Sequence, residues 1–140
     1  MNPPSWVLDT NVIVSGLLVS GGFPGRLVDA ILAGRLRLSY DDRIEAEYRE
    51  VLTRPHFAIS PERREAFLAE LKNQDAIVVA RPWSEKMPPD LVDLPFLEVA
   101  RQTNERTLVT GNTRHFPASA RGPVRVLSPR EAWECLNAEA

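Results

Sequence analysis

A few acidic side chains lie at positions from which a chain can do phosphate chemistry. Asp9 ends the short apolar run WVLD, where an unbalanced charge costs several kcal/mol. Glu45 and Glu47 follow in IEAEY, and Asp93 follows in VDLPF. Carboxylates that converge repel one another unless protons or a cation neutralise them. Mg²⁺ or Mn²⁺ neutralises them through oxygen ligands, activates water and stabilises a phosphate oxyanion, so these residues favour metal-assisted phosphate chemistry.

Nitrogen and sulfur ligands do not form a zinc pattern in this sequence. His56 and His115 are each isolated, and Cys135 is the single cysteine, expected to pack within the apolar AWECL segment. There is no GxGxxG or Walker loop. The GGFPG segment (21–25) is expected to be a mobile turn that helps to gate a substrate, rather than a phosphate cradle. The sequence therefore favours a hard cation bound by oxygen.

Apolar periodicity predicts five strands separated by helices. The predicted strands cover 6–9, 36–40, 76–80, 107–110 and 124–127. The predicted helices cover 26–36, 41–53, a segment that Ser60 caps and Pro61 opens, 94–103, and a last helix whose SPRE start (128–131) has the pattern of a capping box. This alternation is typical of a three-layer α/β fold with a parallel sheet.

Such a sheet would bring the acids to one edge. Ligands bind beyond the carboxyl ends of parallel strands, where the N-termini of the returning helices also lie. Asp9 ends the first predicted strand, Asn112 follows the fourth, and Asp93 begins a helix. Asp93 also shares an inward helical stripe with Phe96 and Leu97. We therefore expect these polar residues to lie at the same edge.

The two aspartates also have purely structural interpretations. Asp93 could be the N-cap of its helix, although Asp90, three residues earlier, could cap instead. Asp9 could cap the turn that follows it, in which Thr10 and Asn11 bond to local backbone groups. In the alternative, Thr10 and Asn11 turn the chain away from the strand and brace the Asp9 carboxylate.

Two glutamates of the predicted helix 41–53 compete for the same role. Its apolar stripe contains Ile44 and Tyr48, and Glu45 and Glu47 flank that stripe on opposite sides. A solvated flank is the ordinary position for either residue. Periodicity alone therefore leaves the choice between them open.

Composition favours one globular domain, covering residues 1–140. The chain has 140 residues, is 44% hydrophobic and carries a net charge of −2, so any nucleic acid must be bound locally. No segment reaches the ~18 to 20 apolar residues of a membrane span, and the start MNPPSW lacks signal-peptide features. We expect a soluble, cytoplasmic protein with no membrane partner. Arginine supplies 15 of the 17 basic residues, which suits phosphate binding but also fits a codon bias.

Four blocks of the sequence, in this order and spacing, resemble a known family. They are VLDTNVIVSGLL, IEAEYREVLTRPHF, PDLVDLPFLEVA and LVTGNTRHFP. Together they are similar to the PIN-domain family, particularly its toxin-like branch of VapC-like ribonuclease toxins. The similarity covers nearly the whole chain. It implies a Rossmann-like sheet with strand order 3-2-1-4-5 and a metal-dependent ribonuclease site.

The resemblance also assigns roles to individual residues. Asp9 matches the first acid of the family, Glu47 the second and Asp93 the third. It therefore selects Glu47 over Glu45. The three acids are the expected ligands of Mg²⁺ or Mn²⁺, and the expected reaction is hydrolysis of RNA phosphodiester bonds.

The remaining expected site residues contact water or substrate. Asn112 stands where many relatives have an acid, and its amide oxygen can accept a hydrogen bond but adds no charge. This departure predicts one tightly bound cation, with a second recruited by substrate phosphate. Thr110 and Asn112 are expected to orient water or a phosphate oxygen. Asn11, Arg43 and Arg114 are the expected RNA contacts, although an ordinary surface position is the commoner one for either arginine.

Partners and rival functions follow from the same resemblance. Toxin-like relatives pair with an antitoxin and often form homodimers, so RNA, an antitoxin and a second copy are the implied partners. One rival is a catalytically weakened PIN-fold module that binds RNA or protein. Another is a phosphatase of a different Rossmann-like class, whose first motif needs a second aspartate where this chain has Asn11.

Overall fold

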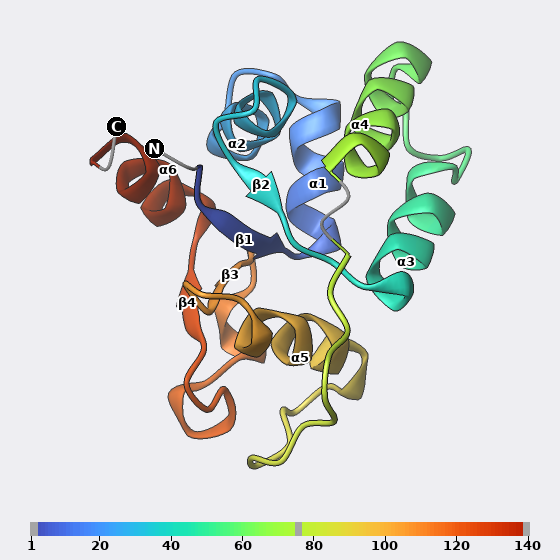
Figure 1. Ribbon diagram of the computed structural model, residues 1–140. Coiled ribbons are helices and arrows are strands. Elements are labelled where there is room, and N and C mark those ends of the chain that lie inside the picture. Colours follow the sequence, from blue (N-terminus) through green and yellow to red (C-terminus); the bar gives the residue numbers. More distant parts are fainter. Residues whose placement is uncertain (1–2, 75–76, 139–140) are drawn as a thin grey trace.

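Helices cover both faces of a parallel four-stranded sheet (Figure 1). The computed structural model describes residues 3–74 and 77–138. The strands are β1 (Ser5–Leu8), β2 (Arg37–Leu38), β3 (Thr107–Val109) and β4 (Arg125–Leu127), in the order β2-β1-β3-β4. The helices are α1 (Thr10–Leu18), α2 (Phe23–Leu32), α3 (Asp42–Leu52), α4 (Pro61–Gln74), α5 (Leu94–Gln102) and α6 (Pro129–Ala138). The expected α/β fold with a parallel sheet between helices is confirmed.

The prediction of five strands in the order 3-2-1-4-5 was wrong. The predicted strand 76–80, of which residue 76 lies outside the described residues, contributes a single parallel bridge between Ile77 and Tyr40. The bridge lies beyond the end of β2, which is only two residues long and therefore offers few backbone groups for a further strand to pair with. Val79 is 92% exposed and Ile77 is 48% exposed, so this apolar run is not buried as a third strand would be. The other four predicted strands pair in the expected relative order.

The central strand β1 positions the edge of the sheet at which the site is built. Its residues 6–8 are fully buried, because β2 and β3 pair with it on either side and α5 packs against it. Leu8 pairs with Val109, which in turn pairs with Leu127, so three strands end level with one another. Asp9 and Thr110 therefore leave the sheet side by side, as their hydrogen bonds across the ladder confirm.

Most predicted helices form close to their expected bounds. In α3 the stripe residues Ile44, Tyr48 and Leu52 are buried, as the periodicity predicts. At the start of α6 the Glu131 N–H donates to the Ser128 side chain, and the Ser128 N–H donates to the Glu131 carboxylate. This is the expected capping box. Cys135, also in α6, packs partly buried against the core, as expected.

The segment after β1 is more helical than the sequence predicts. Residues 10–18 form α1, so the polar residues after Asp9 begin a helix. The GGFPG segment is not a mobile turn, because Phe23, Pro24 and Gly25 form the first turn of α2. Proline suits the first turn of a helix because its missing N–H needs no partner there. In Figure 1, α1 and α2 lie on one side of β1 and α5 lies on the other.

No single helix among residues 3–74 and 77–138 is long and apolar enough to cross a membrane. Helices α1 and α2 pass the length and composition test only when taken together, and they meet at an angle of 93°.

The close approach of α1 and α2 predicts a strong effect of one glycine. A Cβ atom on Gly16 would lie 2.5 Å from Val28 Cγ2 and 2.6 Å from the Pro24 carbonyl oxygen, whereas one on Gly21 would meet nothing within 4 Å. We expect Gly16→Ala to lower the free energy of unfolding by about 1–3 kcal/mol, because the helices must separate. Urea denaturation measures this, with Gly21→Ala as the control. Equal stability of the two variants would contradict the packing described here.

Candidate metal centre

A cleft opens at the carboxyl edge of the sheet, between α1, α3 and the start of α5. Its volume is about 320 Å³. The lining combines acids with a few apolar and basic side chains: Asp9, Thr10, Asn11, Glu47, Val51, Arg54, Phe57, Asp90, Val92, Asp93, Phe96 and His115. The three predicted acids Asp9, Glu47 and Asp93 therefore come from distant parts of the chain into one cleft.

Asp9 is held rigidly at the end of β1. Its N–H donates to the Val109 carbonyl at 2.8 Å, and its Oδ2 accepts a hydrogen bond of 2.8 Å from the Thr110 hydroxyl. The side chain is 7% exposed and makes no capping hydrogen bond to α1. Burial raises the pKa of Asp9, and the Thr110 hydroxyl and the nearby N–H groups of Asn11 and Thr10 partly offset that increase. Thr110, rather than Thr10, is thus the side chain that braces Asp9.

Helix α3 presents Glu47 to the cleft and holds Glu45 away from it. The Thr10 hydroxyl donates a hydrogen bond to Glu47 Oε2. Glu45 instead pairs with Arg49 one turn later at 2.9 Å. The buried Tyr48 hydroxyl donates to the Leu8 carbonyl oxygen, which ties α3 to the strand that carries Asp9. The position of Glu47 therefore depends on contacts with both α1 and β1.

Asp93 ends a short 3₁₀ turn, η1 (Leu91–Asp93), immediately before α5. Asp90 caps this turn by accepting a hydrogen bond of 3.0 Å from the Val92 N–H, and Asp93 makes no capping bond. Asp93 is 7% exposed. The pKa of Asp93 is raised to about 6, first by burial and then by the charges of Asp9 and Asp90, while His115 partly offsets this increase. Asp93 is therefore not the side-chain N-cap of α5, the structural role that its position in the sequence allows.

His115 belongs to the cleft, so the prediction that it is isolated was wrong. It ends the 3₁₀ turn η2 (Thr113–His115), and its Nδ1 lies 3.1 Å from Asp93 Oδ2. Its Nε2 lies 2.9 Å from the side-chain amide nitrogen of Asn112. The available signal was its position three residues after Asn112, which already belonged to the expected edge. A single turn after β3 is enough to bring the ring to Asp93.

These side chains can hold a divalent cation. Within residues 3–74 and 77–138, the one group of three acidic, histidine or cysteine side chains with ligand atoms all within 4.8 Å of one another is Asp90, Asp93 and His115. Asp93 Oδ2 is buried and makes no hydrogen bond, in spite of its short contact with His115. A cation bound here would reduce the repulsion between the carboxylates. It would also give the unbonded oxygen of Asp93 a partner, and hard dications prefer such oxygen ligands. Asp9 and Glu47 line the same cleft but lie outside this close group.

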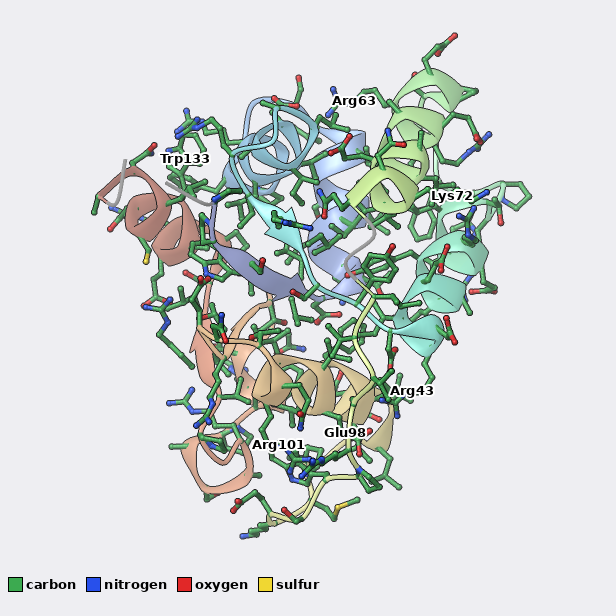
Figure 2. All side chains as sticks on the ribbon, in the orientation of Figure 1. Arg43, Arg63, Lys72, Glu98, Arg101 and Trp133 are labelled. Carbon is green, nitrogen blue, oxygen red and sulfur yellow. The ribbon has the colours of Figure 1, made fainter. Side chains whose placement is uncertain are left out.

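Arg43 lies outside the cleft. Its guanidinium pairs with Asp41 and with the buried Glu98, each at 2.7 Å, and joins α3 to α5 (Figure 2). Glu98 also accepts a hydrogen bond of 2.6 Å from the Trp83 N–H. Asp41, Arg43 and Glu98 border a separate pocket of about 420 Å³ between α3 and the segment 77–82. The two carboxylates that hold Arg43 explain why it does not face the acids.

The other expected contacts differ in their relation to the cleft. Asn11 is exposed and lines it. Arg114 is exposed on η2 and does not line it. Sequence reasoning missed Arg54 and Phe57, which form part of the wall. Both lie in the LTRPHF segment that carries the family resemblance, so the signal was present.

Fold and site together define a class of protein: an α/β domain with a cluster of acids, able to hold a cation, at the carboxyl edge of its sheet. The chain belongs to the PIN-domain family, since the family model described as PIN domain matches residues 5–114. Members of this family are generally metal-dependent nucleases that act on RNA, which suits the cluster of acids. No curated protein and no solved structure matches the chain.

Repulsion among the buried acids predicts how stability depends on pH without metal. The pKa of Asp93 is raised in the folded state from 3.8 to about 6. Its stabilising contribution is therefore fully present below pH 3.8 and is lost as the pH rises through about 6. In EDTA, Asp93→Asn should be more stable than the wild type at pH 7.5 by about 1 kcal/mol, because solvent screening reduces the full effect. At pH 4 the difference should vanish.

Thermal unfolding at the two pH values measures this difference. The exposed Glu85, replaced by glutamine, is the control and should show no comparable gain at pH 7.5. An Asp93→Asn variant that is less stable than the wild type at pH 7.5 would contradict the repulsion.

Proposed function

We propose that the protein is a Mg²⁺- or Mn²⁺-dependent endoribonuclease with one domain spanning residues 1–140. The observation that carries the proposal is the cleft in which Asp9, Glu47 and Asp93 meet, although α1, α2, β2 and α4 separate them along the chain. Membership of the PIN-domain family supports the nuclease activity. The substrate is RNA, and the reaction is hydrolysis of its phosphodiester bonds.

The side chains divide the work between holding a cation and holding the substrate. A divalent cation bound in the cleft would activate water and stabilise charge on the phosphate. Asp9 and Asp93 would hold it, and Glu47 completes the acidic wall. Thr110 fixes the Asp9 carboxylate through its 2.8 Å hydrogen bond, and Asn112 contacts His115, which lies against Asp93. Such preorganised contacts lower the cost of reorganisation during reaction.

The substrate side is open and less acidic. Asn11 lines the cleft, and Arg54 and Phe57 form part of the same wall. A guanidinium suits a phosphate oxygen, and an aromatic ring suits an unstacked base of single-stranded RNA. Arg114 is exposed beyond His115, where the RNA backbone leaving the cleft can reach it. Arg43 is unsuited to this role because two carboxylates hold its guanidinium.

We further propose that the protein is the toxin of a toxin–antitoxin pair, acts in the cytoplasm as a homodimer, and is neutralised by a cognate antitoxin. The support is the resemblance of the four sequence blocks to the toxin-like branch. Inducing its expression in a bacterial host without an antitoxin should arrest growth. Asp9→Asn, expressed to the same level, should not. Normal growth with abundant wild-type protein would refute the toxin role while leaving the nuclease activity open.

Variants of Asp9 and a matched pair on α3, Glu45 and Glu47, test the nuclease directly. Purified protein should cleave labelled single-stranded RNA with Mn²⁺ and stop when EDTA is added. Asp9→Asn and Glu47→Gln should remain folded and lose activity by about 100-fold or more, because each removes a charge from the cleft. Glu45→Gln should keep activity near that of the wild type, since Glu45 pairs with Arg49 outside the cleft.

The same assay separates the rival functions. RNA binding without EDTA-sensitive cleavage would support the weakened binding module, which Asn112 in place of an acid favours. Turnover of small phosphoesters without RNA cleavage would support a phosphatase.

A further inference from the structure

We propose that, in the absence of RNA, the cleft holds its cation at Asp90, Asp93 and His115, and that the imidazole nitrogen makes this site prefer transition-metal dications such as Mn²⁺ over Mg²⁺. The inference rests on the proposed function only in that the cleft binds a divalent cation. The inference adds a nitrogen ligand, His115, to a ligand set that the sequence predicted to consist only of carboxylates.

The spacing of the three side chains matches a coordination sphere. Their ligand atoms all lie within 4.8 Å of one another. Asp93 Oδ2 and His115 Nδ1 are 3.1 Å apart. Two neighbouring ligands of an octahedral ion with bonds of about 2.1 Å are separated by about 3.0 Å. One cation can therefore contact both atoms without a large rearrangement of the backbone.

A second observation points to a missing partner at this place. Asp93 Oδ2 is fully shielded from solvent and makes no hydrogen bond, and the whole residue is 7% exposed. A buried carboxylate oxygen without a hydrogen bond is costly and uncommon. Its nearest charged neighbours include Asp9 and Asp90, whose charges repel it. A cation between Asp93 and His115 removes both penalties.

Asn112 is placed to orient the histidine ring. Its carboxamide lies 2.9 Å from His115 Nε2. A histidine that binds metal through Nδ1 carries its proton on Nε2 and donates it to a nearby acceptor. With the carboxamide turned so that Oδ1 faces Nε2, Asn112 provides this acceptor and adds no further negative charge. The Asn112 amide then orients the metal ligand His115, whereas an acid at this position would itself have been a metal ligand.

The donor set explains the expected selectivity. Mg²⁺ keeps an almost complete shell of oxygen ligands and loses water reluctantly. Imidazole nitrogen binds first-row transition metals better, with affinity rising from Mn²⁺ to Cu²⁺. One imidazole with two carboxylates should therefore shift preference away from Mg²⁺ while still accepting it. Asp9 and Glu47 line the same cleft outside this close group and remain for a cation that arrives with substrate phosphate.

Magnetic coupling to histidine nitrogen tests the ligand directly. Tag-free protein is prepared with natural and with ¹⁵N-labelled histidine, loaded with one equivalent of Mn²⁺ and measured by pulsed electron paramagnetic resonance. We expect a directly bound nitrogen whose signal changes with the isotope. The chain has two histidines, so the same signal in His56→Gln assigns the ligand to His115. This assignment does not depend on whether a His115 variant folds.

Calorimetry supplies the selectivity. Free wild-type protein should bind one Mn²⁺ tightly. His115→Gln should weaken Mn²⁺ binding by about tenfold or more and Mg²⁺ binding by less than about threefold, because glutamine offers oxygen but no imidazole nitrogen. His56→Gln should change neither affinity.

Three results would overturn the inference: no Mn²⁺ bound by the free protein, bound Mn²⁺ without histidine coupling, or coupling that disappears in His56→Gln. RNA cleavage measured on the same samples keeps the two proposals distinguishable. Mn²⁺-dependent cleavage without histidine coupling refutes only the nitrogen ligand. Histidine coupling without any cleavage leaves the metal site standing and refutes the nuclease.

Discussion

Repulsion between buried carboxylates is the constraint around which this structure is arranged. Asp9 and Asp93 are each 7% exposed, and the charge of Asp9 contributes to the raised pKa of Asp93. Nothing in the hydrophobic effect would favour that arrangement. It persists because the elements that carry the acids are fixed by contacts elsewhere, so the acids cannot move apart without breaking the core.

The contacts that hold the acids are spread over the whole chain. The parallel ladder of β1, β3 and β4 ends level, which fixes Asp9 beside Thr110. The Tyr48 hydroxyl ties α3 to β1, and the pair of Arg43 with Glu98 ties α3 to α5. Arg43 therefore contributes by holding together two helices that border the cleft. The stabilising contacts of the sheet and helices offset the repulsion between the acids at the carboxyl edge of the sheet, as is common at functional sites.

Patterns with a local cause were predicted well. The buried strands 6–9 and 107–110 contain runs of apolar residues that few other structures would satisfy, and the capping signals at Ser60 and Ser128 mark true helix starts. The failures share a different cause. The run 76–80 has the composition of a strand, but burial depends on what covers it, and the partner strand β2 is too short to extend the sheet. The composition of a segment indicates which secondary structures it can form, and tertiary contacts decide which of them it adopts.

The sequence by itself determined four of the strands, most of the helices, the family, and the three acids that meet in the cleft. The strands and helices follow from local periodicity, and the acids follow from motifs, with Glu47 chosen over Glu45 by the family resemblance. Only the tertiary structure decided that Thr110 braces Asp9, that Arg43 faces Glu98, and that His115 lies against Asp93. These contacts join residues on different elements, and a shift of a few ångströms in packing would exchange one partner for another. The physical reason is that hydrogen bonds and ion pairs act over short distances, whereas the sequence specifies those distances only through the completed fold.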